Sequence, residues 1–225
     1  MKKILVFAAH PDDELLGCGA TLLKYQKKGF KIKTFFFGDG ESSRNLDKKK
    51  ILKSIIRREK QAVSVSKKGK FEKPIFKRFP DNKLDTVPLL DIVKFIEKQI
   101  RDNKPEIIFT HFENDLNIDH QLTHSAVITA CRPVPNFSVN EIYGFEVLSS
   151  TEWSNSQQSI FKPTFYADIT NYISKKISAA RAYEEEMRDP PHSRSIKHIE
   201  ILAQHRGFSI GVDMAEAFEV YRIVG

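Results

Sequence analysis

The sequence predicts an α/β protein with a Rossmann-like fold, in which helices flank a mainly parallel sheet and a small C-terminal lobe follows. Over about residues 1–148, short apolar runs rich in β-branched and aromatic residues alternate with stretches of helical apolar spacing. This alternation is typical of a parallel sheet with right-handed crossovers. A chain of 225 residues suits one domain. We therefore expect a core over about 1–148 and a C-terminal lobe over about 149–225.

The predicted core begins with a buried strand over Lys3–Ala8 and a helix over about Leu15–Lys28, which Gly29 ends. The second strand is expected over Lys31–Phe37, because its three consecutive phenylalanines indicate burial on both faces. The later core elements follow the same alternation: a basic helix over about Asp47–Lys68, a strand over Ile75–Lys77, a helix over Val87–Arg101, a strand over Glu106–Thr110, a helix over Ile118–Cys131 and a strand over Glu141–Leu148.

The pattern changes after Ser149. The stretch from Trp153 to Pro163 is polar and predicts a loop. A charged helix is expected over Tyr172–Met187, before a Pro-Pro pair that interrupts it. A further helix is expected over Ser195–Arg206 and a strand over Ala215–Val224.

Composition limits the functional classes. The net charge is +7, but the lysines gather on one predicted helix, which is more typical of a solvated face than of a nucleic-acid site. We therefore expect no nucleic-acid partner, whereas an anionic small substrate would benefit from the same positive electrostatic field. Cys18 and Cys131 follow no zinc or redox spacing, so we expect buried thiols and a cytoplasmic protein. We recognise no signal peptide and no apolar run of the roughly 20 residues that span a bilayer.

The most informative motif stands directly behind the first strand, where His10, Asp12, Asp13 and Glu14 crowd together. Open α/β folds build their sites at the carboxyl ends of strands. Three carboxylates there are costly unless a cation or a proton compensates them. Because neighbours in an extended segment point to different sides, His10 and Asp13 can reach one ion while Asp12 stays off it. A helix N-terminus also favours acidic residues, but that does not explain the histidine.

A second polar cluster follows the strand predicted over Glu106–Thr110 and should reach the same edge of the sheet. Asp119 and His120 open a helix, and His124 lies one turn further along the same face. His10, Asp13 and His120 would supply two nitrogens and one oxygen. Three protein ligands and an open position are typical of catalytic zinc, although iron or manganese suits the same donors.

The motif His10-Pro11-Asp12-Asp13-Glu14, followed by Asp119-His120, resembles the PIG-L/LmbE family of zinc-dependent N-deacetylases. The resemblance extends from the first strand to about Arg132, with a weaker echo at Ala215-Glu216-Ala217-Phe218. Members remove acetyl groups from N-acetylglucosamine-type sugars and related amides. The resemblance implies a Rossmann-like fold, zinc held by His10, Asp13 and His120, and Asp12 as the general base.

Other candidates follow from position. Asp119 is expected to orient an imidazole of the metal site. Many family members carry a histidine where this chain has Asn117, which can donate a hydrogen bond to an oxyanion but carries no charge. His192 in the Pro-Pro-His-Ser loop, or His124, is a candidate substitute. For His124, simple packing on its own helix is an equal alternative.

Substrate contacts are expected from three regions. Arg57 and Arg58 lie where the family tends to place a substrate-binding arginine, and the sequence leaves open which of them faces inward. Asp39 and Glu41 follow the second strand, and Asp81 and Asn82 follow Phe79-Pro80. These four residues suit either sugar hydroxyls or turn formation.

The sequence therefore predicts a cytoplasmic, zinc-dependent hydrolase that removes the acetyl group of an N-acylated amino sugar, which is nucleotide-linked, lipid-linked or part of a small glycoside. One alternative is an amidase of another small N-acyl metabolite. Another is an inactive protein that binds carbohydrate or metal. Asn117 favours this last possibility and Asp12 argues against it.

Overall fold

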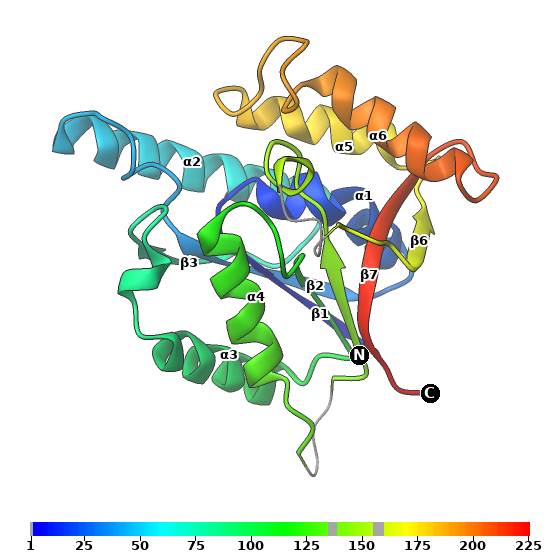
Figure 1. Ribbon diagram of the computed structural model, residues 1–225, viewed down its shortest axis with the longest axis horizontal. Coiled ribbons are helices and arrows are strands. Elements are labelled where there is room, and N and C mark those ends of the chain that lie inside the picture. Colours follow the sequence, from blue (N-terminus) through cyan, green and yellow to red (C-terminus); the bar gives the residue numbers. More distant parts are fainter. Residues whose placement is uncertain (1, 135–138, 155–159) are drawn as a thin grey trace.

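The computed structural model describes residues 2–134, 139–154 and 160–225 (Figure 1). Within these ranges seven strands form one sheet in the order β3-β2-β1-β4-β5-β7-β6. The first five run parallel, whereas β7 pairs antiparallel with both β5 and β6. The predicted α/β fold with a mainly parallel sheet is thereby confirmed.

The described elements match the predicted core elements, with ends shifted by a few residues. The strands are β1 (Lys3–Ala8), β2 (Lys31–Gly38), β3 (Ile75–Phe79), β4 (Ile107–His111), β5 (Glu141–Phe145), β6 (Phe165–Asp168) and β7 (Ala215–Ile223). The helices are α1 (Asp13–Lys27), α2 (Lys48–Gly69), α3 (Leu89–Asn103), α4 (Ile118–Ala130), α5 (Ile173–Ala180) and α6 (Ile196–Phe208). Short 3-10 turns cover Leu84–Thr86 (η1), Thr151–Trp153 (η2) and Arg181–Tyr183 (η3).

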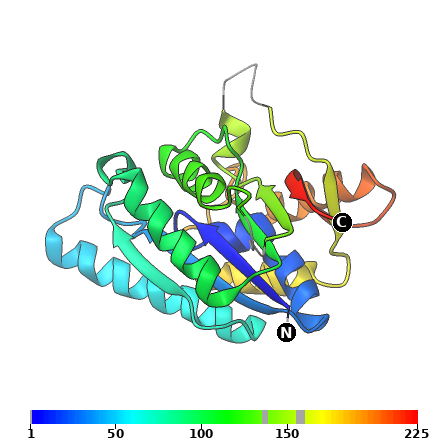
Figure 2. The same ribbon diagram turned by 90° about the horizontal axis from the view of Figure 1, so that it is seen from below.

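The sheet separates two apolar cores because successive strand residues point to opposite faces. In β1, Ile4 and Val6 face one core and Leu5 and Phe7 face the other, and all four are fully buried. The first core packs against α1, α2, α5 and α6, and the second against α3 and α4. Figures 1 and 2 show these two helical layers on either side of the sheet.

Two C-terminal expectations need correction. The helix expected over Tyr172–Met187 is shorter: α5 ends at Ala180 and tightens into η3. The reason is tertiary, because Tyr183 is fully buried and its hydroxyl donates to Glu14 Oε1 at 2.9 Å. Strand β6 was not predicted, since four residues are too short to show a period of two and only pairing with β7 defines the strand.

The residues assigned to a C-terminal lobe extend the same sheet through β7 and β6. Of the predicted loop between Trp153 and Pro163, residues 155–159 lie outside the described ranges. Cys18 and Cys131 are free and buried, and burial raises the pKa of Cys131 to about 12. None of the helices in the described ranges has the length and apolarity needed to span a bilayer.

A buried ion pair attaches the C-terminal part to α1. Lys176 Nζ lies 2.6 Å from Glu216 Oε1 and also donates to the carbonyl of Leu16 at 2.6 Å. Glu216 in turn accepts from the backbone N–H groups of Ala20 and Thr21 at 3.1 and 2.7 Å. The weak sequence echo around Glu216 therefore has a structural role. It holds the middle of the helix whose first residue is Asp13.

We predict that Lys176→Met lowers the free energy of unfolding by about 3–5 kcal/mol, because it leaves the Glu216 carboxylate buried without its cation. Urea unfolding followed by circular dichroism measures this. Lys175→Met is the matched control, since Lys175 is exposed on the same helix and its replacement should change stability by less than about 0.5 kcal/mol. Equal effects of the two substitutions would contradict the prediction.

Candidate metal centre and active-site pocket

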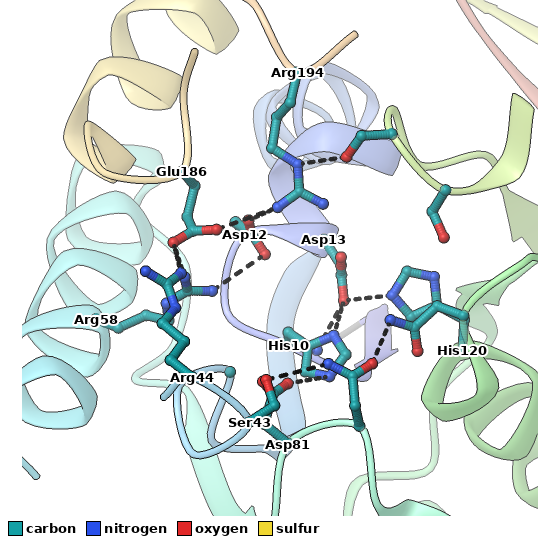
Figure 3. A pocket seen from close by; sticks show the side chains of 15 residues that line it. His10, Asp12, Asp13, Ser43, Arg44, Arg58, Asp81, His120, Glu186 and Arg194 are labelled. Atoms are coloured by element: carbon teal, nitrogen blue, oxygen red, sulfur yellow. Dashed lines mark hydrogen bonds and ion pairs between the residues drawn. The ribbon is translucent and has the colours of Figure 1, made fainter. Parts of the chain in front are cut away.

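A polar pocket opens at the carboxyl edge of the sheet, where loops following β1, β2 and β4 meet (Figure 3). Open α/β sheets generally carry their ligand sites at this edge. The cavity measures about 220 Å³. Of its 15 lining residues, all carry polar or charged side chains except Gly40. It therefore suits a small, highly polar ligand.

His10, Asp13 and His120 converge at the base of this pocket, and all three are buried. Asp13 Oδ2 lies 3.4 Å from His10 Nδ1 and 3.4 Å from His120 Nε2. Two atoms bound tetrahedrally at the usual zinc distances of 2.0–2.1 Å would be about 3.3–3.4 Å apart. These separations and the two-nitrogen, one-oxygen donor set therefore fit a divalent metal ion.

The far nitrogen of His10 is held by two carboxylates. His10 Nε2 lies 3.0 Å from Asp119 Oδ2 and 3.1 Å from Asp81 Oδ1. Asp119 is itself anchored, because it accepts from the backbone N–H groups of Asn82 and Leu84 at 2.8 and 2.9 Å. This arrangement turns Nδ1 of His10 toward Asp13. Carboxylates orient metal-binding imidazoles in the same way.

The raised pKa values of the histidines in this cluster indicate an excess of negative charge around them. Burial opposes charging of His120, but Asp13 and Asp115 outweigh it and raise the pKa of His120 to about 9. Burial is likewise outweighed at His10, where Asp119, Asp13 and Asp81 raise the pKa. Without a cation, protons on the imidazoles balance the carboxylates. A bound metal ion would replace those protons.

His111 is the part of the centre that the sequence argument did not single out. Its ring stacks on His120 with 3.9 Å between ring centroids, and its Nε2 accepts from the backbone N–H of Ala9 at 2.8 Å. Burial lowers its pKa, so the ring stays neutral. Its place at the end of β4, beside the strand that precedes His10, was the available signal.

Asp12 lines the pocket but lies outside the donor group. Its φ of 136° is in the region that favours glycine, a strain that typically occurs at functional sites. Asp12 Oδ2 accepts from Arg194 Nη1 at 3.0 Å. Burial raises the pKa of Asp12, although Arg194 and Arg58 oppose the shift.

The two arginines predicted to bind substrate lie in different surroundings. Arg58 is buried, lines the pocket and donates to Glu41 Oε1 at 2.8 Å, whereas Arg57 is half-exposed and pairs with Glu185. Arg58 also contacts Glu186, a buried carboxylate that pairs with Arg194 as well. The structure therefore turns Arg58, and not Arg57, toward the site.

Of the three residues considered for stabilising the oxyanion, only Asn117 lines the pocket. Asn117 lines the pocket and caps α4, since its Oδ1 accepts from the N–H of Asp119 at 2.8 Å. His192 is exposed and lies outside the pocket lining, with Nδ1 accepting from the N–H of Arg194 at 3.0 Å. His124 points to the carbonyl of His111 at 3.0 Å and packs on Tyr221. His124 therefore has a packing role.

The acidic loop residues have different surroundings. Asp39 caps its own turn, accepting from the N–H groups of Glu41 and Ser42 at 2.9 and 2.8 Å, and it does not line the pocket. Asp81 does line it, and although burial opposes ionisation, the hydrogen bond from His10 lowers the pKa of Asp81 to about 2. Sequence spacing alone could not separate a turn carboxylate from one that faces a ligand.

Fold and pocket together define an α/β protein with a buried histidine–aspartate centre at the carboxyl edge of its sheet. Residues 5–131, more than half of the chain, match the PIG-L family, described as GlcNAc-PI de-N-acetylase. The chain belongs to this family of deacetylases.

Individual relatives agree with this membership. The Uncharacterized deacetylase YaiS of Escherichia coli K12 is 27% identical over 188 residues, covering 81% of this chain and 91% of that protein. N,N'-diacetylchitobiose deacetylase of Pyrococcus horikoshii superposes with a TM-score of 0.81 at 21% identity, covering 98% of this chain and 84% of that one. GalB, the 4-carboxy-2-hydroxymuconate hydratase of Pseudomonas putida, reaches 0.78 at 17% identity, covering 100% and 99%. The last two show a shared fold.

We predict that His120→Ala weakens Zn²⁺ binding by more than about 100-fold, a loss beyond that expected for a partner outside the coordination sphere. Isothermal titration calorimetry on protein stripped with a chelator measures it. His124→Ala is the control: it removes an imidazole one turn along the same helix that faces a backbone carbonyl, so its affinity should stay within about threefold of wild type. Unchanged affinity in His120→Ala would place the ion elsewhere.

Proposed function

We propose that this protein is a zinc-dependent N-deacetylase that hydrolyses the acetamido group of an amino sugar, with Asp12 as the general base. The supporting observation is the juxtaposition of three buried metal-type donors with a second carboxylate, Asp12, which stands outside the donor group and lines the same pocket. Family membership supports the reaction class.

His10, Asp13 and His120 are the residues that would hold the zinc ion, and the same donors would accept iron or manganese. When bound, the ion would polarise the amide carbonyl and acidify water. Asp119 and Asp81 keep His10 in its binding orientation through Nε2.

Asp12 accepts a proton from the attacking water and returns it to the departing amine nitrogen. Burial raises the pKa of Asp12 and so makes the carboxylate a stronger base than an exposed aspartate. Asn117 offers its side-chain amide, now donating to Asn82 Oδ1 at 3.0 Å, to the developing oxyanion.

The lining favours a polyhydroxylated substrate. Arg58, Asp81 and Asn82 bring donors and acceptors to the cavity, and none of the described residues lines it with an apolar side chain. A sugar ring would find hydrogen-bond partners there, whereas a long acyl chain would meet only polar walls and lose the benefit of burial. We therefore expect acetyl to be preferred over longer acyl groups.

We predict that zinc-loaded protein releases acetate from at least one member of a panel of N-acetylated sugars, sugar nucleotides and small glycosides. Asp12→Asn should lower kcat by at least about 100-fold, the usual range for loss of an acid–base group, while Zn²⁺ still binds. Enzymatic acetate detection gives the rate, and elemental analysis gives the metal content.

The same panel separates the alternatives. Release from non-sugar N-acyl compounds alone would identify an amidase of another metabolite. No release from any member, with zinc tightly bound, would favour a binding protein. Activity retained in Asp12→Asn would assign the base elsewhere.

The oxyanion assignment has its own test. We predict that Asn117→Ala lowers kcat by about 10-fold or more, whereas His192→Ala leaves kcat within about twofold, because His192 is exposed outside the pocket lining. Steady-state kinetics on the best panel substrate measures both. A large loss in His192→Ala with metal retained would reverse the assignment.

A further inference from the structure

The segment between η3 and α6 reaches across to the pocket and brings one side chain to Asp12. Figure 3 shows Arg194 entering from this segment, opposite the donor group of His10, Asp13 and His120. Its Nη1 donates to Asp12 Oδ2 at 3.0 Å. Arg194 lies 182 residues away from Asp12 along the chain, so only the tertiary fold joins them.

We propose that Arg194 is a positioning residue that holds the Asp12 carboxylate in the orientation required for proton transfer. The inference rests on the proposed function, in which Asp12 is the base. With Oδ2 occupied by the guanidinium, Oδ1 remains available to receive a proton. A guanidinium offers several N–H donors and no acceptor, so it can orient the base without accepting the transferred proton.

Arg194 is itself held rigidly enough for this task. Its Nε donates to Ser149 Oγ at 2.9 Å, and Nη1 also lies 3.3 Å from Glu186 Oε2. Its side chain is 18% exposed. The backbone is anchored too, because the carbonyl of Arg194 accepts from the N–H of Arg188 at 2.8 Å. Contacts on both sides of the guanidinium leave it little rotational freedom.

Asp12 has little else to fix its side chain. Among the residues that the structure describes, Arg194 is the one group within hydrogen-bond distance of its carboxylate, since Arg58 Nη1 stands 3.9 Å away. Arg58 is already engaged by Glu41 and Glu186. Removing Arg194 would therefore free the carboxylate to rotate while leaving the zinc donors in place.

The test compares wild type, Arg194→Met, Arg194→Lys and the control Arg188→Met, an exposed arginine of the same segment outside the pocket. We expect Arg194→Met to lower kcat by about 10- to 100-fold, as small misplacements of reacting groups do, with KM within about threefold. Arg194→Lys should recover part of kcat by restoring one charged donor, and Arg188→Met should match wild type.

A rise in KM with kcat retained would overturn the proposal, because Arg194 would then bind substrate. Unchanged kinetics in Arg194→Met would overturn it equally. If Arg194→Met does not fold, Arg194→Lys carries the test, since the shorter single-point contact should still lower kcat more than about threefold.

A crystal structure of the folded Arg194 variant separates this inference from the proposed function. We expect the Asp12 carboxylate to be displaced and the donor group unmoved; a carboxylate in the wild-type position would overturn the proposal whether or not acetate is released. Failure of wild type to release acetate would refute only the proposed deacetylation. Loss of activity in Asp12→Asn, alongside full kcat in Arg194→Met, would refute only the role of Arg194.

Discussion

The burial of opposite charges at one edge of the sheet is the constraint on which the rest of this structure depends. Asp12, Asp13 and Asp119 are almost completely removed from solvent, and isolated carboxylates in such a place would cost several kcal/mol each. Imidazoles, backbone N–H groups and guanidinium groups satisfy them instead. These partners meet because β1 and β4 are neighbours in the sheet and α1 and α4 begin at its carboxyl edge.

The C-terminal third completes this balance. Glu186 gathers Arg44, Arg58 and Arg194 around one buried carboxylate. Lys176 and Glu216 hold the middle of α1, the helix that presents Asp13. Strands β7 and β6 extend the sheet, and Glu216 lies on β7. The part that the sequence suggested as a small lobe thus contributes to the site, because it supplies the guanidinium of Arg194 to the buried carboxylate of Asp12.

The fold by itself does not name the reaction. A hydratase and a deacetylase superpose on this chain equally closely in practical terms, with TM-scores of 0.78 and 0.81. The chemistry lies in the side chains at the sheet edge and in what surrounds them. Here the polar lining, the donor group and the separate carboxylate of Asp12 are the features from which deacetylation of a small, polar amide is proposed.

The order of strands and helices was predictable from the sequence, because local apolar periodicity reports which faces are buried. His10, Asp12 and Asp13 were also recognisable, because they directly follow the first strand, and Asp119 and His120 because they open the helix that follows β4. The carboxyl ends of both strands must reach the same edge of the sheet. Only the tertiary structure decided between Arg57 and Arg58, brought Glu186 and Arg194 to the site, and defined β6. Two adjacent arginines project from different sides of the same helix, and only the packing of that helix determines which side faces the pocket. Contacts across more than a hundred residues, such as Asp12 with Arg194, leave no trace in local spacing.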